Sequence, residues 1–190
     1  ATIMAEVVRN TRLSKSLFWI TLRSSHIAQM AKPGQFVHML NGDSYDPLLR
    51  RPYSLSAIDP DGATFSILYH VVGRGSAWLS RRRPGNQVDS LGPLGTYFEV
   101  TSRNRHLLMI GGGIGMGPLV ALARSTEAHI ESVIINGART ADGLLPTQYV
   151  PSSVELRSTT DDGSCGTSGS AVDLLPEWYD WADQIFACGP

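Results

Sequence analysis

The sequence predicts two domains, an antiparallel β-barrel followed by an α/β domain built on a parallel sheet. Up to about residue 102, short apolar runs are separated by turn-forming segments, a pattern typical of a small antiparallel barrel or sandwich. Beyond that point an apolar run leads directly into a glycine-rich turn and a helical pattern, which indicates a βαβ unit. A chain of 190 residues has room for two small domains, and we place them at 1–102 and 103–190.

The first domain consists of short strand-like runs. In the run at 64–72, Phe65 and Ile67 share one face, because successive side chains of a strand point to opposite faces. Similar runs lie at 3–8, 16–22 and 35–40, with turn segments between them such as the one at 41–47. Only one helix is expected in this domain, at 76–82, because the Pro-Gly pair that follows opposes its continuation.

The second domain begins with an apolar run at 107–110 that enters a glycine-rich turn at 111–118. A helix is expected over 118–129, where apolar residues recur at helical spacing. Further strand-like runs lie at 133–136, 154–157 and 184–187. This order of strand, turn, helix and strand predicts a parallel sheet with the potential to bind a nucleotide.

The charges are balanced, which excludes several partners. Sixteen Lys and Arg against seventeen Asp and Glu give a net charge of −1, so we expect neither nucleic acid nor an anionic membrane as a partner. The three arginines at 81–83 are interpreted as the cationic end of the expected helix. The longest uncharged stretch, 107–123, is shorter than the ~20 apolar residues of a membrane helix. The first residues contain no apolar signal core, so we expect a cytoplasmic protein.

The glycine-rich turn is the first motif with chemical meaning. A turn without bulky side chains lets backbone N–H groups and a helix N-terminus approach a pyrophosphate, although a tight turn without any ligand is the alternative. A dinucleotide fingerprint needs Gly at positions one, three and six, but counting from Gly111 reaches Met116 and counting from Gly113 reaches Pro118. The usual acidic ribose ligand after the second strand is also missing. The turn therefore predicts a nucleotide-binding domain of another type.

Two further motifs predict anion binding in the first domain. The segment at 50–56 places an Arg, with its planar fork of donors, beside a Tyr ring and a Ser hydroxyl, although an Arg beside Pro is more often a solvated turn. Further along, Gly73 and Gly75 precede Ser76 at the expected helix start, where N–H groups and a hydroxyl are available to an anion. Two such sites in one domain suit a dinucleotide that has its own aromatic ring system.

These motifs together resemble the ferredoxin–NADP reductase superfamily. The strings RPYS, GRGS, GPLG, GGGIGMGP, TTDDGSCGTSG and CGP occur in the order and approximate spacing of that superfamily and cover nearly the whole chain. Within it, TDDGS followed by VDLL is most similar to the electron-transfer subunits of NAD-dependent dihydroorotate dehydrogenases. Related subunits of NAD(P)H-linked hydrogenases and of ferredoxin:NADP oxidoreductase complexes carry similar strings.

The resemblance implies an FAD site on the barrel. Arg51 would bind the diphosphate, Tyr53 would lie along the isoalloxazine and ribityl, and Ser54 would bond near the reactive flavin edge. The full set implied to contact FAD is Arg51, Pro52, Tyr53, Ser54, Leu68, Tyr69, His70, Gly75 and Ser76, the last two at its pyrophosphate.

The resemblance also implies an NAD(P)H site on the second domain. The glycine turn would lie over the nucleotide diphosphate, the TDDGS string would line the nicotinamide, and the CGP string would lie where nicotinamide meets flavin. The residues implied are Gly112, Gly113, Gly115, Gly117, Pro118, Thr160, Asp161, Gly163, Cys188 and Gly189. Ser54 and Cys188 are the two positions implied to be catalytic.

The implied activity is that of an FAD-dependent NAD(P)H oxidoreductase. Hydride would pass from nicotinamide to flavin, which needs orientation and electrostatics rather than an acid–base pair. Electrons would continue to an iron–sulfur centre and a catalytic partner subunit, in the dihydroorotate-linked form serving pyrimidine synthesis. The alternatives are a stand-alone ferredoxin or flavin reductase, a hydrogenase-linked NAD(P)H reductase subunit, and a non-catalytic nucleotide-binding module. NADH is expected before NADPH, although Arg139 could pair with a 2′-phosphate.

The sequence departs from the family in its cysteines. Subunits of this branch continue past CGP to a cysteine-rich loop whose four thiolates hold a [2Fe–2S] cluster. This chain has only Cys165 and Cys188, both in nucleotide motifs, so we expect no metal ligands and a cluster only in a longer full-length chain. We therefore expect a piece of a longer subunit, with the second domain incomplete at its C-terminus; the alternative is a module whose flavin passes electrons directly to another protein.

Overall fold

The computed structural model describes residues 2–42 and 49–190 and shows two compact units, Ala1–Tyr97 and Phe98–Pro190. The division lies after Tyr97 rather than after residue 102. Residues 98–101 belong to the second unit because they are bound within it. The Phe98 ring lies 5.0 Å from Phe186, and the side chain of Gln184 accepts a hydrogen bond from the Thr101 N–H. Most of the turn expected at 41–47 falls outside the described residues.

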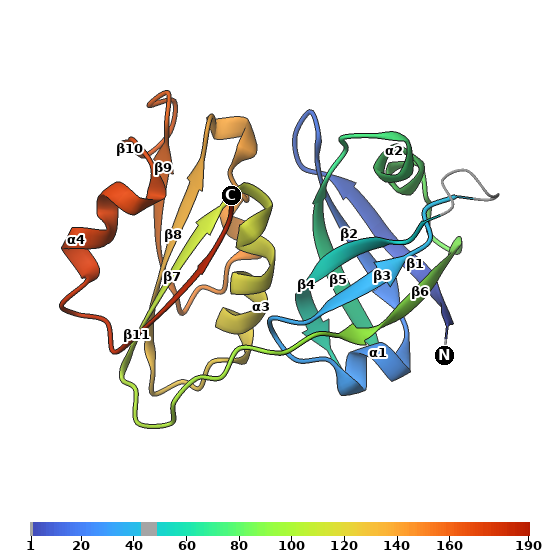
Figure 1. Ribbon diagram of the computed structural model, residues 1–190, viewed down its shortest axis with the longest axis horizontal. Coiled ribbons are helices and arrows are strands. Elements are labelled where there is room, and N and C mark those ends of the chain that lie inside the picture. Colours follow the sequence, from blue (N-terminus) through green and yellow to red (C-terminus); the bar gives the residue numbers. More distant parts are fainter. Residues whose placement is uncertain (1, 43–48) are drawn as a thin grey trace. The chain divides into compact units, whose positions relative to one another are not determined.

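The first unit is a closed antiparallel barrel with the strand order β1-β2-β5-β4-β3-β6 (Figure 1). Its strands are β1 (Ile3–Arg12), β2 (Leu17–Arg23), β3 (Phe36–Met39), β4 (Arg51–Asp59), β5 (Thr64–His70) and β6 (Gln87–Leu94). The barrel expected from the alternating runs is thereby confirmed, and the sandwich is excluded.

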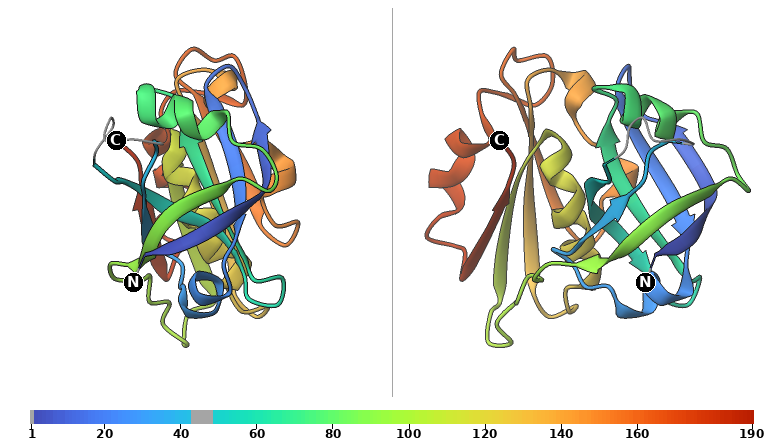
Figure 2. Two further views of the ribbon diagram at one scale, coloured as in Figure 1. Left: turned by 90° about the vertical axis from the view of Figure 1, so that its right-hand side faces the viewer. Right: turned by 45° about the vertical axis from the view of Figure 1, so that its right-hand side comes forward.

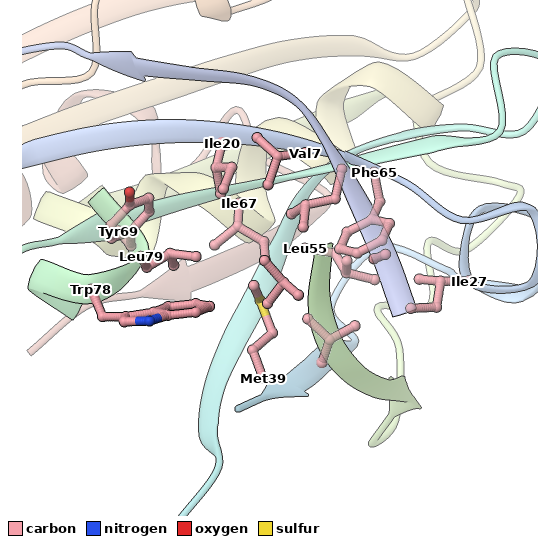
Figure 3. Packing of buried hydrophobic residues seen from close by; sticks show 14 residues of the cluster. Val7, Ile20, Ile27, Met39, Leu55, Phe65, Ile67, Tyr69, Trp78 and Leu79 are labelled. Carbon is pink, nitrogen blue, oxygen red and sulfur yellow. The ribbon is translucent and has the colours of Figure 1, made fainter. Parts of the chain in front are cut away.

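The barrel core is built from the inward-facing positions of these strands (Figure 3). Phe65, Ile67 and Tyr69 of β5 alternate into it with exposed fractions of 1% or less, and Leu55 of β4 and Ile20 of β2 are fully buried. A buried side chain of this size contributes about 1.5–3 kcal/mol of hydrophobic free energy. This core gives β4 and β5 a fixed backbone on which the candidate site is built.

Two helices lie at opposite ends of the barrel (Figures 1 and 2). The expectation of a single helix in this domain is wrong, because α1 (Ser25–Met30) also forms there, started by a hydrogen bond from the Ile27 N–H to the Ser24 hydroxyl. The other helix, α2, spans Arg74–Ser80 instead of 76–82. It begins two residues earlier because Gly73 is the N-cap and Ser76 lies inside the first turn.

The second unit is a five-stranded parallel sheet with the order β10-β9-β8-β7-β11. Helix α3 covers one face, and the η4–α4 segment packs on the other (Figure 1). The strands are β7 (His106–Gly112), β8 (Glu131–Ala138), β9 (Glu155–Thr160), β10 (Thr167–Ser168) and β11 (Gln184–Cys188). The helices are α3 (Met116–Ser125), α4 (Leu175–Trp178) and the short 3₁₀ turns η1 (Gly113–Gly115), η2 (Ala141–Gly143), η3 (Thr147–Tyr149) and η4 (Ala171–Leu174).

Helix α3 ends at Ser125, before the expected end at 129. The hydroxyls of Ser125 and Thr126 both donate to the carbonyl of Leu122, each at 2.9 Å. These side-chain bonds occupy an acceptor near the helix end, and Thr126 is already extended. Among the described residues, no helix is long and apolar enough to cross a membrane.

Candidate functional site

Strand β4 carries the Arg-Pro-Tyr-Ser motif, and its side chains alternate between two faces. Pro52 and Ser54 are exposed, whereas Tyr53 is half-buried and packs against the barrel core. On the neighbouring strand β3, Phe36 lies opposite Ser54 and His38 lies opposite Pro52. The rings of these two β3 residues lie 5.4 Å apart. This face of the barrel therefore combines an accessible hydroxyl with two partly exposed aromatic rings.

The Tyr53 ring is held in place from two sides. Its hydroxyl accepts a hydrogen bond from Asn41 Nδ2, and its ring meets the Tyr69 ring edge to face, with centroids 6.1 Å apart. Burial raises the pKa of Tyr53 more than the Asn41 hydrogen bond and the nearby Arg51 charge lower it. Tyr53 is therefore a neutral phenol with a fixed ring.

Two adjacent arginines at the start of β4 have different surroundings. Arg50 is committed to Asp89, with one nitrogen 2.7 Å from its Oδ2 and another donating to its backbone oxygen at 3.1 Å. Arg51 donates to the Leu49 carbonyl, and within the described part of the chain it has no carboxylate partner. Arg50 thus anchors the strand to β6, and Arg51 retains donors for an anion.

The three residues at 68–70 differ in burial. The side chains of Leu68 and Tyr69 are buried, with exposed fractions of 5% and 1%, and the Tyr69 hydroxyl donates to Asn10 at 3.1 Å. His70 is half-buried, and its Nδ1 lies 3.2 Å from the Ser16 hydroxyl. Leu68 and Tyr69 can therefore offer a ligand mainly backbone groups, because both side chains are buried, Tyr69 in the barrel core and Leu68 on the opposite face of β5.

The start of α2 uses Ser76 differently from the sequence expectation. Its hydroxyl accepts hydrogen bonds from the N–H groups of Val72 (2.9 Å) and Gly73 (3.1 Å) and donates to the Gly73 carbonyl. Ser76 therefore braces its own turn. Gly75 is buried in the same turn. What remains for an anion is the set of first-turn N–H groups, which have no acceptor within the helix.

The glycine turn of the second unit lies at the switch point of the sheet. Strand β7 pairs with β8 on one side and with β11 on the other, so the strand order changes direction at β7. Ligands of open α/β sheets bind in the crevice outside the carboxyl ends of the strands at such a point. Gly111 at the end of β7 lies opposite Cys188 at the end of β11, so the structure brings the two motifs together across a long sequence separation.

The backbones at this crevice approach so closely that side chains are excluded. A Cβ on Gly115 would lie 2.1 Å from the Cys188 carbonyl oxygen, and a Cβ on Gly189 would lie 3.0 Å from the Gly112 nitrogen. Gly113, with a φ of +54°, has nothing within 4 Å of an added Cβ and so faces open space. The crevice is lined by main-chain atoms, which suits a diphosphate.

Gly117 and Pro118 form the start of helix α3. Both are buried in the first turn of α3, where Pro is compatible with the helix because the first N–H groups have no partner there. These two residues shape the helix start, and the open part of the turn is formed by residues 112–114.

The loop after β9 is a rigid turn built around Thr160. The Thr160 hydroxyl donates to the Cys165 carbonyl at 2.9 Å and accepts from the Cys165 N–H at 3.0 Å. Gly163 adopts a φ of +69° within this turn, and the exposed Asp161 donates its N–H to Ala138 at the end of β8. Thr160 is thus fully buried and holds the loop, while Asp161 is presented to solvent beside the carboxyl end of β8.

The thiol of Cys188 is half-buried, and this burial raises its pKa. Because the thiolate is the nucleophile, iodoacetamide at pH 8 should alkylate the exposed Cys165 well before Cys188. Alkylation of Cys188 should increase as the pH rises through its raised pKa. In the folded chain the proton is bound more tightly than in the unfolded chain, so stability falls with pH in that same range. Peptide mass spectrometry over a pH series measures the alkylation rates of both cysteines. Equal rates for Cys165 and Cys188 at pH 8 in the folded chain would contradict the raised pKa of Cys188.

Several site residues have no signal in the sequence. Asn10 in β1, Asn41 before β4 and the Arg50–Asp89 pair support the motif residues through contacts between distant positions. No local spacing pattern identifies them. In the described ranges, no group of three or more His, Cys, Asp or Glu residues is placed to hold a metal ion.

Known proteins similar to this chain were found by sequence. No protein-family model matches it. It is 37% identical over 181 residues to a protein of Geobacillus kaustophilus named dihydroorotate dehydrogenase B (NAD(+)), electron transfer subunit. A protein of the same name from Desulforamulus reducens is 33% identical over 190 residues. These matches cover 94% and 98% of this chain and 70% and 72% of the two relatives.

Solved structures similar to the model share its architecture. The structure of an NADH-dependent reduced ferredoxin-NADP oxidoreductase matches all of this chain and 69% of its own, with a TM-score of 0.85 and 27% identity. The ferredoxin reductase of carbazole 1,9a-dioxygenase matches with a TM-score of 0.79 and 26% identity over 61% of its length. A ferredoxin-NADP⁺ reductase from Plasmodium falciparum, at 13% identity and a TM-score of 0.78, shares the fold.

Proposed function

Because this chain belongs to the family of the electron transfer subunits of dihydroorotate dehydrogenase B, we propose that its barrel binds FAD and its parallel sheet binds NADH. The chain is an FAD-dependent NAD(P)H oxidoreductase of the ferredoxin reductase type. It works as the electron transfer part of a hetero-oligomer with a catalytic dihydroorotate dehydrogenase subunit. We place this complex in the cytoplasm.

The observation that carries the proposal is the crevice at the carboxyl ends of β7 and β11. Its walls are main-chain atoms, since a Cβ at Gly115 would overlap the Cys188 carbonyl and Gly113 opens into free space. The first turn of α3 follows directly; there Met116 already donates its N–H to the carbonyls of Gly113 and Ile114, and Pro118 has no N–H, so Gly117 is the donor nearest the turn. A dinucleotide diphosphate fits such a crevice because N–H groups and the helix dipole favour its charge.

The barrel residues fit FAD by the chemistry of their donors. Arg51 has guanidinium donors for the diphosphate, and the first-turn N–H groups of α2 add further donors. The exposed Ser54 hydroxyl offers a hydrogen bond to a flavin edge. The aromatic Tyr53 is already fixed by Asn41 and Tyr69, so its orientation costs little on binding.

When bound, the cofactors supply the redox chemistry, which is a hydride transfer between nicotinamide and flavin followed by single-electron transfer to an iron–sulfur centre. The protein residues bind and orient. No residue at either site is required as a general acid or base, which agrees with the neutral phenol of Tyr53 and the raised pKa of the Cys188 thiol. Cys188 acts through its backbone, which forms one wall of the crevice, and through the bulk of its thiol.

The experiment that tests this function is reconstitution with FAD followed by anaerobic addition of NADH. We expect a yellow protein whose flavin absorbance bleaches on NADH addition. Binding of both cofactors without bleaching would favour the non-catalytic nucleotide-binding module. Direct reduction of added ferredoxin in the absence of a catalytic subunit would favour the stand-alone reductase.

The charges beside the crevice favour NADH over NADPH. Arg139, after β8, is exposed, and its carbonyl accepts a hydrogen bond from the Asp162 N–H at 3.2 Å. The carboxylates of Asp161 and Asp162 are therefore in the neighbouring loop. They offset the attraction of one arginine for a 2′-phosphate, because like charges repel.

We expect NADH to bind at least tenfold more tightly than NADPH. Arg139→Ala should weaken NADPH binding severalfold and change NADH binding by less than twofold. Isothermal titration calorimetry measures the Kd for each nucleotide. Arg103→Ala is the control for loss of an exposed arginine elsewhere in the unit. Tighter binding of NADPH to the wild-type chain would refute the assignment.

A further inference from the structure

Asn10 in β1 joins three elements of the barrel through one amide group. Its Nδ2 donates to the carbonyl of Leu79 at 2.9 Å and to the carbonyl of Arg82 at 3.1 Å. Its Oδ1 accepts from the Tyr69 hydroxyl at 3.1 Å. Both amide protons and the amide oxygen are thus engaged, and strand β1, the end of α2 and strand β5 are tied together.

The bond from Tyr69 to Asn10 connects Asn10 to Tyr53, which belongs to the proposed FAD site. Tyr69 is 1% exposed, stacks on Phe18 with centroids 5.6 Å apart, and meets the Tyr53 ring edge to face. Its position in the core cluster is seen in Figure 3. Burial raises the pKa of Tyr69, so its hydroxyl donates to Asn10 throughout the neutral range. Asn10 therefore fixes the ring against which Tyr53 rests.

The second connection leads to the carboxyl end of α2. This helix has seven residues, and its N-cap Gly73 has no side chain with which to cap it. A helix of this length is marginal by itself, and its terminal carbonyls need partners. Asn10 supplies partners at the carboxyl end, at Leu79 within the helix and at Arg82 just beyond it. Loss of these two bonds would leave α2 less ordered, including its first turn.

We propose that Asn10 is a positioning residue for FAD, which orders both the Tyr53 ring and α2 before the cofactor binds. The inference rests on the proposed function of the barrel. Asn10 acts through Tyr69 and α2, and it needs no contact with the cofactor. Its effect is preorganisation, because a site that is ordered in advance loses less entropy on binding.

The test compares FAD binding by Asn10→Ala, by Tyr69→Phe and by the double variant. Tyr69→Phe removes only the hydroxyl and keeps the core ring, so it tests the inference even if Asn10→Ala folds poorly. We expect the FAD Kd to rise about tenfold for Asn10→Ala and severalfold for Tyr69→Phe, because hydrogen bonds of this kind are individually modest. The double variant should bind FAD about as weakly as Asn10→Ala alone, since the two residues share one bond.

A spectroscopic signature separates positioning from mere stability. In both single variants the visible absorbance and circular dichroism of the bound flavin should change, because the Tyr53 ring beside it is less constrained. Thr21→Val is the matched control. It removes a 2.9 Å hydrogen bond to Ser66 between β2 and β5 of the same barrel without touching Asn10 or Tyr69, so it should leave Kd and spectrum unchanged.

Failure of this inference and failure of the proposed function give different results. If the wild-type chain binds FAD but the variants show unchanged Kd and flavin spectra and only a lower Tm, Asn10 is a stabilising residue and the inference is overturned. If the wild-type chain binds no FAD, the proposed function fails, and this inference fails with it.

Discussion

Replacing Arg51 by glutamine should weaken FAD binding about 10- to 100-fold. Hydrogen bonds to charged groups contribute about 1.5–3 kcal/mol, and each 1.4 kcal/mol is tenfold in affinity. Arg51 donates one N–H to the Leu49 carbonyl, and its guanidinium has further donors that can bind the FAD diphosphate. Glutamine is shorter than arginine; it keeps some donor capacity but removes the charge. Fluorescence titration of the apo chain with FAD measures the change in Kd.

The neighbouring Arg50 provides the control. Arg50→Gln removes the same charge one residue away, but Arg50 is bound to Asp89 in β6. We expect this variant to lose stability, because the half-buried Asp89 loses its partner, while FAD binding measured well below Tm changes less than threefold. If the two variants weakened FAD binding equally, the diphosphate would be attracted by the general charge of the strand and not by Arg51 specifically.

The parts of this fold that were predicted from sequence are those with a local period. The faces of β5 follow directly from the alternation of Phe65 and Ile67, and the start of α3 follows from the glycine turn and the apolar run behind it. Helix α1 has six residues and no long periodic face, so Ser24 was its only sequence signal. Strand β6 contains a Gly-Pro pair that interrupts the pattern, although pairing with β1 and β3 holds it in the barrel.

The candidate site also has parts that the sequence predicts and parts that it does not. The motifs at Arg51 and at the glycine turn are local strings, and the resemblance to a family assigned each of them to a cofactor site. Whether a motif side chain is available to a ligand depends on its tertiary partners. Tyr69 is directed into the core and bonded to Asn10, and Ser76 and Thr160 use their hydroxyls within their own turns. Such assignments require contacts between residues as far apart as Asn10 and Tyr69, which no spacing rule contains.

Replacing Gly115 by alanine should reduce the rate of flavin bleaching by NADH about 100-fold or more while leaving FAD binding unchanged. The added methyl carbon would lie 2.1 Å from the carbonyl oxygen of Cys188 and 2.5 Å from its carbonyl carbon. Both are backbone atoms of a strand paired along its length with β7, so no side-chain rotation relieves the overlap. The turn and the strand end must separate, and a misplacement of about 1 Å between reacting groups costs roughly 100-fold in rate. Stopped-flow bleaching under anaerobic conditions measures it.

Gly113→Ala separates this close approach from the ordinary cost of replacing a glycine. Gly113 has a φ of +54°, and an added Cβ there meets nothing within 4 Å. Its alanine variant overlaps no protein atom and adds the strain of a left-handed residue, about 1–2 kcal/mol, so it should bleach faster than Gly115→Ala. Because the barrel is a separate compact unit, both variants should bind FAD like the wild-type chain. If Gly115→Ala bleached as fast as Gly113→Ala, the contact between the glycine turn and Cys188 would not shape the nucleotide site, and hydride transfer would depend on other parts of the second unit.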